Sequence, residues 1–155
     1  MNTEHLAIGY RALEPAKTEN FNLDTWQNAF PERPLASAVK ELHNYGMTAC
    51  AGGLLALSPE FQALGGSISS VGSPIFEGGT HQQALYAFYE TKANSLRESA
   101  IDLIHNTVSH RESDDFYDVE FISDVTPKQV QEKFAILYFI LKWLEKNNES
   151  IKNRA

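Results

Sequence analysis

The clearest pattern of apolar positions lies near the C-terminus, where large apolar residues recur at alternating spacings of four and three. The row consists of Val130, Phe134, Leu137, Leu141 and Leu144. This spacing places the side chains on one face of an α-helix. The row follows Thr126-Pro127-Lys128-Gln129, which is typical of a capping box with proline at the first helical position. We therefore predict a final helix that begins at Pro127.

The middle of this helix is apolar nearly all round, and Lys142 is the only charged residue in FAILYFILKWL. A helix of this kind lies in the centre of a core or shares a face with a partner. We expect the central position. If Tyr138 and Trp143 face outward instead, the pattern indicates a partner, and a homo-oligomer through the 130–144 helix becomes an alternative.

Shorter helices are expected along the rest of the chain. One ends before Pro15, one is stopped by Gly46, one starts after Thr48 as N-cap, and one restarts at Pro59. Another helix follows Thr80. The Gly- and Ser-rich stretch 66–79 predicts a small β-hairpin or an ordered loop, and alternation over 117–121 allows a short strand. The fold class is mainly α, a helical bundle in a single domain over 1–147, followed by a polar C-terminal tail over 148–155.

Composition agrees with one folded domain. The chain has 155 residues, of which 43% are apolar, and a formal net charge of −7. An acidic chain is a poor partner for nucleic acids and for anionic membranes. The N-terminus does not resemble a signal peptide, and no apolar run is long enough to span a membrane. One cysteine cannot form an internal disulfide, which suits a reducing compartment, so we expect a cytoplasmic protein.

That cysteine, Cys50, is the main catalytic candidate. It lies in TACAGG at the expected start of a helix, where a thiol could be activated by a histidine such as His81. A free cysteine beside alanine and glycine is more often a small buried residue. We therefore expect Ala49 to Gly53 to let another segment approach closely. A small cysteine hydrolase that uses Cys50 and His81 remains the alternative.

Metal and cofactor sites are not expected. His105 and His110 lie five residues apart, a spacing that does not share one helix face, so Asp102 and these histidines do not predict a metal site. The Gly-rich stretch has no following lysine and is not a phosphate-binding loop. We predict neither a metal nor a cofactor.

The densest charge lies between residues 112 and 124, where acidic residues alternate with aromatic ones. A solvated loop and a docking face for a protein with a basic surface are both consistent with this composition. The predicted contact residues are Asp114, Asp115, Phe116, Tyr117, Asp118 and Glu120, together with Ile75 and Phe76 of the Gly- and Ser-rich stretch.

A Trp, then Thr-Ala-Cys-x-Gly-Gly, then Pro-x-Phe occur in order in FNLDTW, TACAGG and SPEF. This arrangement resembles small uncharacterised proteins of bacteriophages and mobile elements. The resemblance implies an accessory protein that binds a host protein, and it implies no reaction. We therefore expect a small acidic, non-catalytic binding protein that inhibits or modulates a host or cognate protein. An acidic mimic of nucleic acid is a further alternative.

Overall fold

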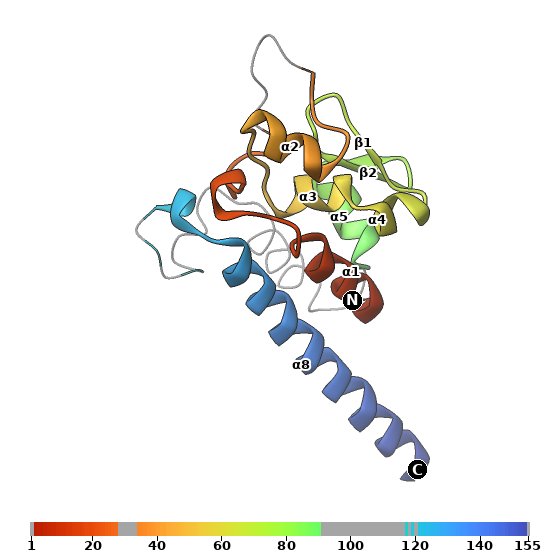
Figure 1. The fold of residues 1–155 in the computed structure, drawn as a ribbon. Helices are drawn as coiled ribbons and strands as arrows, with labels where there is room; N and C mark the ends of the chain where they lie inside the picture. Colours follow the sequence, from red (N-terminus) through yellow and green to blue (C-terminus); the bar gives the residue numbers. More distant parts are fainter. Residues whose placement is uncertain (1, 28–33, 91–116, 118, 120, 155) are drawn as a thin grey trace.

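The structure is a computed structural model, and it describes residues 2–27, 34–90, 117, 119 and 121–154. The helices in this part of the chain are α1 (Thr3–Ala12), α2 (Val39–Tyr45), α3 (Ala51–Leu57), α4 (Pro59–Ala63), α5 (Gln82–Phe88) and α8 (Pro127–Arg154). A small antiparallel sheet lies between α4 and α5 along the chain (Figure 1). The described residues are thus mainly helical, as predicted, but they form a mixed arrangement rather than a plain helical bundle.

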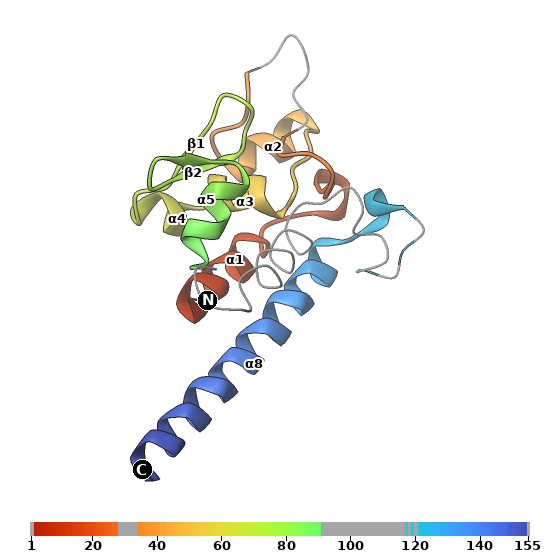
Figure 2. The same cartoon turned by 180° about the vertical axis from the view of Figure 1, so that it is seen from behind.

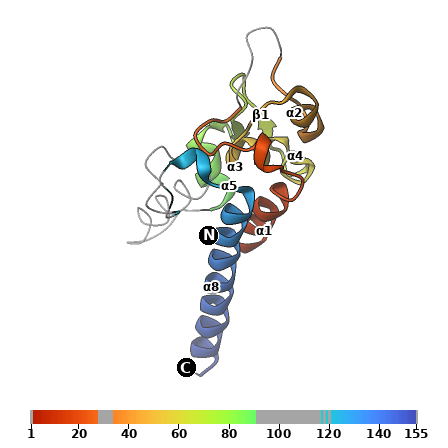
Figure 3. The ribbon, with the colours of Figure 1, turned by 60° about the vertical axis from the view of Figure 1, so that its left-hand side comes forward.

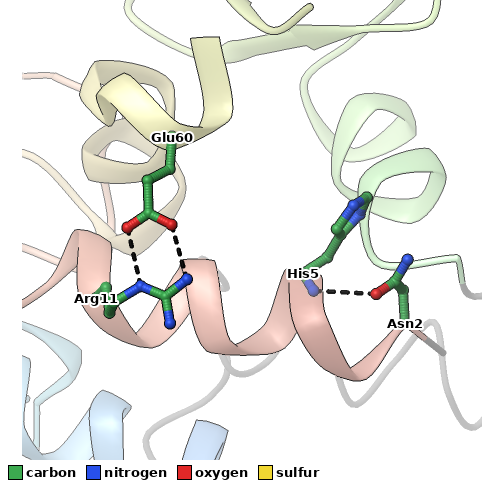
Figure 4. A network of polar contacts seen from close by, with 4 residues as sticks. All are labelled: Asn2, His5, Arg11 and Glu60. Carbon is green, nitrogen blue, oxygen red and sulfur yellow. Dashed lines mark hydrogen bonds and ion pairs between the residues drawn. The ribbon is translucent and has the colours of Figure 1, made fainter. Parts of the chain in front are cut away.

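Helix α1 is fixed at both ends by polar contacts (Figure 4). The Asn2 side chain caps it by accepting a hydrogen bond from the backbone N–H of His5 at 3.0 Å. Near its C-terminal end, the Arg11 guanidinium donates to both carboxylate oxygens of Glu60 in α4, at 2.8 and 2.7 Å. This bidentate pair joins α1 to α4 across 49 residues of sequence.

The predicted helix signals around Gly46 and Pro59 are confirmed. Helix α2 ends at Gly46, whose φ of +64° is the left-handed conformation that favours glycine. Pro59 occupies the first turn of α4, with Ser58 as the N-cap. The predicted N-cap at Thr48 is wrong, because Cys50 caps α3. The Thr48 hydroxyl oxygen is instead buried without a hydrogen-bond partner among the described residues.

The Gly- and Ser-rich stretch forms a small antiparallel sheet, which agrees with the predicted hairpin rather than with the alternative of an ordered loop. Strands β1 (Ser67–Ile68), β2 (Pro74–Phe76) and β3 (Gly79–Thr80) pair antiparallel in that order. Ile75 in β2 lies opposite Ser67 on one side and opposite Thr80 on the other. The turns use residues with positive φ, including Gly72 at +83° and Gly78 at +79°.

Aromatic side chains join the sheet to the helices in one core. Phe88 of α5 packs edge-on against Phe61 of α4 and Phe76 of β2, with ring centroids 5.0 and 5.3 Å apart. Tyr89 continues the cluster to Phe134 of α8 at 5.7 Å. Because each of these rings is buried, the core runs from the sheet to the N-terminal half of α8.

Helix α8 begins with the predicted capping box. The Thr126 backbone N–H donates to Gln129 Oε1 at 2.8 Å, and the Gln129 backbone N–H donates to Thr126 Oγ1 at 3.3 Å. The helix then continues to Arg154, so most of the predicted polar tail is helical. We call the described residues that precede α8 the body. In all three orientations the C-terminal half of α8 extends away from the body (Figures 1, 2 and 3).

The short strand predicted over 117–121 is not found among the described residues of that stretch. Tyr117 is in a helical conformation, and residues Ile122–Asp124 form a 3₁₀ turn. The apolar alternation has another cause. Tyr117 is buried and Val119 packs against the core, so both apolar side chains contact the core without forming a strand.

Candidate functional site

The neighbourhood of Cys50 is a packed part of the core. Cys50 has no exposed surface, and its Sγ accepts a hydrogen bond from the Gly53 backbone N–H at 3.4 Å, which makes it the cap of α3. A Cβ added at Gly52 would lie 2.5 Å from the Trp26 ring, and one at Gly53 would lie 1.8 Å from the Trp26 carbonyl oxygen. The small residues therefore admit the segment that carries Trp26, as the sequence predicts for close packing.

His81 lies at the start of α5 and is exposed. Its imidazole stacks on Trp26 with ring centroids 5.9 Å apart, and its φ of +57° is unusual for a residue with a side chain. Cys50 is fully buried, whereas His81 is exposed. The geometry thus places the thiol in the interior and the imidazole at the surface, with Trp26 against both α3 and His81.

Most of the predicted acidic contact segment lies outside the described residues. This applies to Asp114, Asp115, Phe116, Asp118 and Glu120, and also to the histidines and aspartate considered for a metal. Tyr117 is described, and it is buried beneath α8 with Lys133 Nζ 5.8 Å from its ring centroid. Burial raises the pKa of the Tyr117 phenol well above its ordinary value. Its ring therefore belongs to the core.

The two predicted contact residues of the sheet differ in exposure. Phe76 is buried in the aromatic core, whereas Ile75 is half-buried on the opposite face of β2. Val71, in the turn before β2, is 49% exposed. The sheet thus presents isolated apolar side chains rather than a continuous apolar surface.

A continuous apolar surface occurs on α8 instead. Its members recur at helical spacing and are exposed, and we call them the α8 face. They are Ile136 (54% exposed), Phe139 (70%), Ile140 (52%) and Trp143 (64%). At 100° per residue, the mean direction of this row lies more than 90° round the helix from that of the buried residues Val130, Phe134 and Leu137. Leu144, the last member of the predicted row, is 42% exposed. Helix α8 therefore has two apolar sides, and only one of them packs on the part of its own chain that the structure describes.

Contacts with α1 show how far the body supports α8. The Gln131 amide donates to the Tyr10 carbonyl at 3.2 Å, and Lys142 Nζ lies 3.7 Å from the Glu4 carboxylate. The two helices therefore run antiparallel along this stretch. Beyond Lys142, the described contacts of α8 lie within the helix itself, since Glu145 pairs with Lys142 and the Asn147 amide donates to the Trp143 carbonyl. The helix extends past the body (Figure 1).

A groove of about 440 Å³ lies between α1 and α8, beside the α8 face. Its lining is mainly apolar and includes Leu6, Ala7, Tyr10, Ala135, Tyr138 and Phe139. Phe139 belongs to both the groove and the α8 face, so the two form one continuous surface. Arg11 and Glu14 provide the polar rim.

Charge is divided unequally between α8 and the rest of the chain. Helix α8 carries six basic and three acidic residues, a net charge of +3. The other 127 residues carry seven basic and seventeen acidic residues, a net charge of −10. A basic amphipathic helix attached to an acidic body is typical of an interaction element.

The described residues contain neither a cluster of metal ligands nor a membrane-spanning helix. No group of three or more His, Cys, Asp or Glu side chains there could hold a metal ion. No helix in that part of the chain combines the length and apolar character needed to cross a membrane. No protein-family model, curated protein or solved structure matches the chain.

The sequence contains a second apolar row in α8, in addition to the predicted row that starts at Val130. Two apolar rows overlap between residues 134 and 144, and their union gives a helix that is apolar all round. The sequence analysis named outward positions of both Tyr138 and Trp143 as the sign of a partner. The structure places Trp143 outward and Tyr138 half-buried at the groove.

Proposed function

We propose that this chain is a non-catalytic protein-binding protein whose main contact surface is the α8 face. One observation carries the proposal, namely four large apolar side chains that are each more than half exposed on one side of a helix. Exposed apolar patches of more than a few hundred Å² are rare on monomeric proteins and mark contacts with other molecules. Aromatic residues such as Phe139 and Trp143 are also enriched in the centres of protein interfaces.

The acidic body supplies the second part of the proposal. A net charge of −10 outside α8 favours association with a protein that has a basic surface, and it accelerates encounter through electrostatic steering. The proposed role is therefore that of a cytoplasmic accessory protein, of the kind found in phages and mobile elements, that modulates a host or cognate protein by binding it. Cys50 acts in this proposal as a helix cap rather than as a nucleophile.

Quantitative capture tests the α8 face. A tagged wild-type chain is compared with a Phe139→Glu, Trp143→Glu double variant, and retained proteins are counted, a second untagged copy of the chain included. The matched control is Val71→Glu, which places the same charge at an exposed apolar residue outside α8. We expect the double variant to lose proteins that both wild type and the control retain. Equal retention by all three chains would contradict the proposal.

Two further variants separate binding from the alternatives. Replacing Asp114, Asp115 and Asp118 by Asn should slow association with a basic partner and flatten its salt dependence, because exposed charges mainly set the association rate. Cys50→Ala should leave capture unchanged at a temperature where the variant is folded. Loss of capture in folded Cys50→Ala would instead favour the cysteine hydrolase.

A further inference from the structure

The residues on and beside the α8 face form a pattern that could pair with a second copy of the same helix. We propose that a second copy of this chain covers the α8 face, with the two α8 helices antiparallel and related by a two-fold axis near Phe139. The inference rests on the proposed function in one respect, that the α8 face is a contact surface for protein. It goes further by naming the occupant, the orientation and the register.

Charge placement supports this register. Glu132 lies seven residues before Phe139, and Lys146 lies seven residues after it. Seven residues make nearly two helical turns, so the three side chains share one row along the helix. A two-fold axis at Phe139 therefore brings Glu132 of each copy opposite Lys146 of the other. Neither side chain forms an ion pair within the described part of its own chain.

Side-chain size supports the same register. Ala135 lies four residues before Phe139, and Trp143 lies four residues after it. The proposed axis sets the exposed indole of each copy opposite the smallest side chain of the other α8 helix. Ala135 also lines the groove beside α1, which leaves room for a large ring. Large side chains packing against small ones are the usual means by which paired helices interdigitate.

The area is sufficient for a specific pair. From the exposed fractions of its four members, with side chains of about 150–250 Å² for the aromatic residues, the α8 face offers roughly 500 Å² per copy. Complete coverage of these four side chains would bury about 1,000 Å² in a symmetric pair, the lower limit for a specific interface. The antiparallel arrangement also lays the projecting half of each α8 along the supported half of the other. Both acidic bodies stay free for a basic partner.

Sedimentation equilibrium of the full chain between about 1 and 100 µM tests the occupant. We expect a monomer–dimer equilibrium that does not proceed to larger species, because a two-fold interface closes on itself. Phe139→Glu should shift the chain to monomer, since it places two carboxylates at the axis. Val71→Glu should dimerise like wild type. A wild-type chain that stays monomeric at 100 µM, or that forms open-ended polymers, overturns the proposal.

Charge exchange tests the orientation and register. Glu132→Lys alone and Lys146→Glu alone each create two repulsive pairs, and each should weaken dimerisation about five- to tenfold. The double variant restores opposite charges and should return to within about twofold of wild type. In a parallel pair each residue would face its own copy, so the double variant would give no such rescue. Unchanged affinity in the single variants, or a double variant weaker than both, would refute the register.

The two proposals fail in different ways. If the chain is monomeric and its α8 variants lose a captured protein, the proposed function is supported and the dimer is refuted. If the chain dimerises through Phe139 but its α8 variants capture the same other proteins as wild type, the dimer is supported. The contact with a host protein then lies outside the α8 face. The unfolding transition of each variant shows that it is folded before either result is used.

Discussion

Gly9 of α1 provides a sharp test of how α8 is held on the body. A Cβ at this position would lie 2.4 Å from the Tyr89 hydroxyl oxygen and 2.9 Å from two atoms of the Phe134 ring. Ordinary contacts between heavy atoms are about 3.5–4.0 Å. Both rings are fully buried, so neither can rotate into solvent. Gly9 is therefore a point of close approach between α1, Tyr89 and α8.

The expected effect of Gly9→Ala is a balance of two terms. Alanine gains about 1 kcal/mol of helix propensity over glycine. Overpacking in a closed core costs about 1–3 kcal/mol. Because contacts on two rings must each relax, we expect the second term to prevail and the free energy of unfolding to fall by about 1–2 kcal/mol. For a chain of this length, that lowers Tm by roughly 2–8 °C.

A double-mutant cycle with Tyr89→Phe identifies the cause. The Tyr89 hydroxyl is buried without a hydrogen-bond partner among the described residues, and burial raises the pKa of this phenol far above its usual value. Tyr89→Phe removes that unpaired hydroxyl and should be neutral or stabilising by about 1 kcal/mol. In the Tyr89→Phe background, Gly9→Ala should cost about 1 kcal/mol less, because its shortest contact is gone.

Urea unfolding followed by circular dichroism measures all four chains of the cycle. Ala7→Gly, two residues away in the same helix, gives the propensity term alone and should lose about 1 kcal/mol. Two results would show that the close contact at Gly9 does not restrain α8. One is a Gly9→Ala variant that is more stable than wild type by about 1 kcal/mol, and the other is additive effects of Gly9→Ala and Tyr89→Phe.

Two further predictions concern the helix cap and the surface ion pair. Cys50→Ser should change the free energy of unfolding by less than about 0.5 kcal/mol, because serine can keep the hydrogen bond from Gly53. Cys50→Ala should lower it by about 0.5–2 kcal/mol. Equal losses in chemical denaturation would refute a capping role. The hydrogen bonds from Arg11 lower the pKa of Glu60, so the folded state binds its proton less readily than the unfolded state. Glu60→Gln should therefore lose less than about 1 kcal/mol at pH 7, and this difference should vanish as pH falls through the lowered pKa; a difference that persists at pH 2 would contradict the assignment.

Local signals in the sequence predicted most helix ends correctly. Gly46, Pro59 and the Thr126 to Gln129 capping box each act within one helical turn, so their effects are encoded by neighbouring residues. Thr48 shows the limit of such rules. Threonine is a common N-cap, so the local rule favours Thr48. The segment that carries Trp26 packs on α3, whose first residue is Ala51, and the N-cap is therefore Cys50.

The candidate site was less predictable because exposure depends on contacts between distant segments. Tyr117 follows Phe116 and precedes Asp118, and Phe76 follows Ile75 and precedes Glu77. This mixture of apolar and acidic neighbours suits an exposed anchor as well as a buried one. Both are buried because other elements, α8 and the aromatic cluster around Phe88, cover them. Periodicity assigns a residue to one face of its own element, and it does not say which faces meet another element.

Helix α8 shows this limit most clearly and also explains why it matters for function. Its sequence contains two apolar rows, and either could have packed on the body. Gly9 decides between them, because only a glycine in α1 lets the Phe134 ring approach, and that contact orients the row with Phe139 and Trp143 outward. The same contact fixes the direction in which the projecting half of α8 leaves the body. A loosened α1–α8 contact should therefore weaken both folding stability and association through the α8 face, whereas Phe139→Glu should weaken association alone.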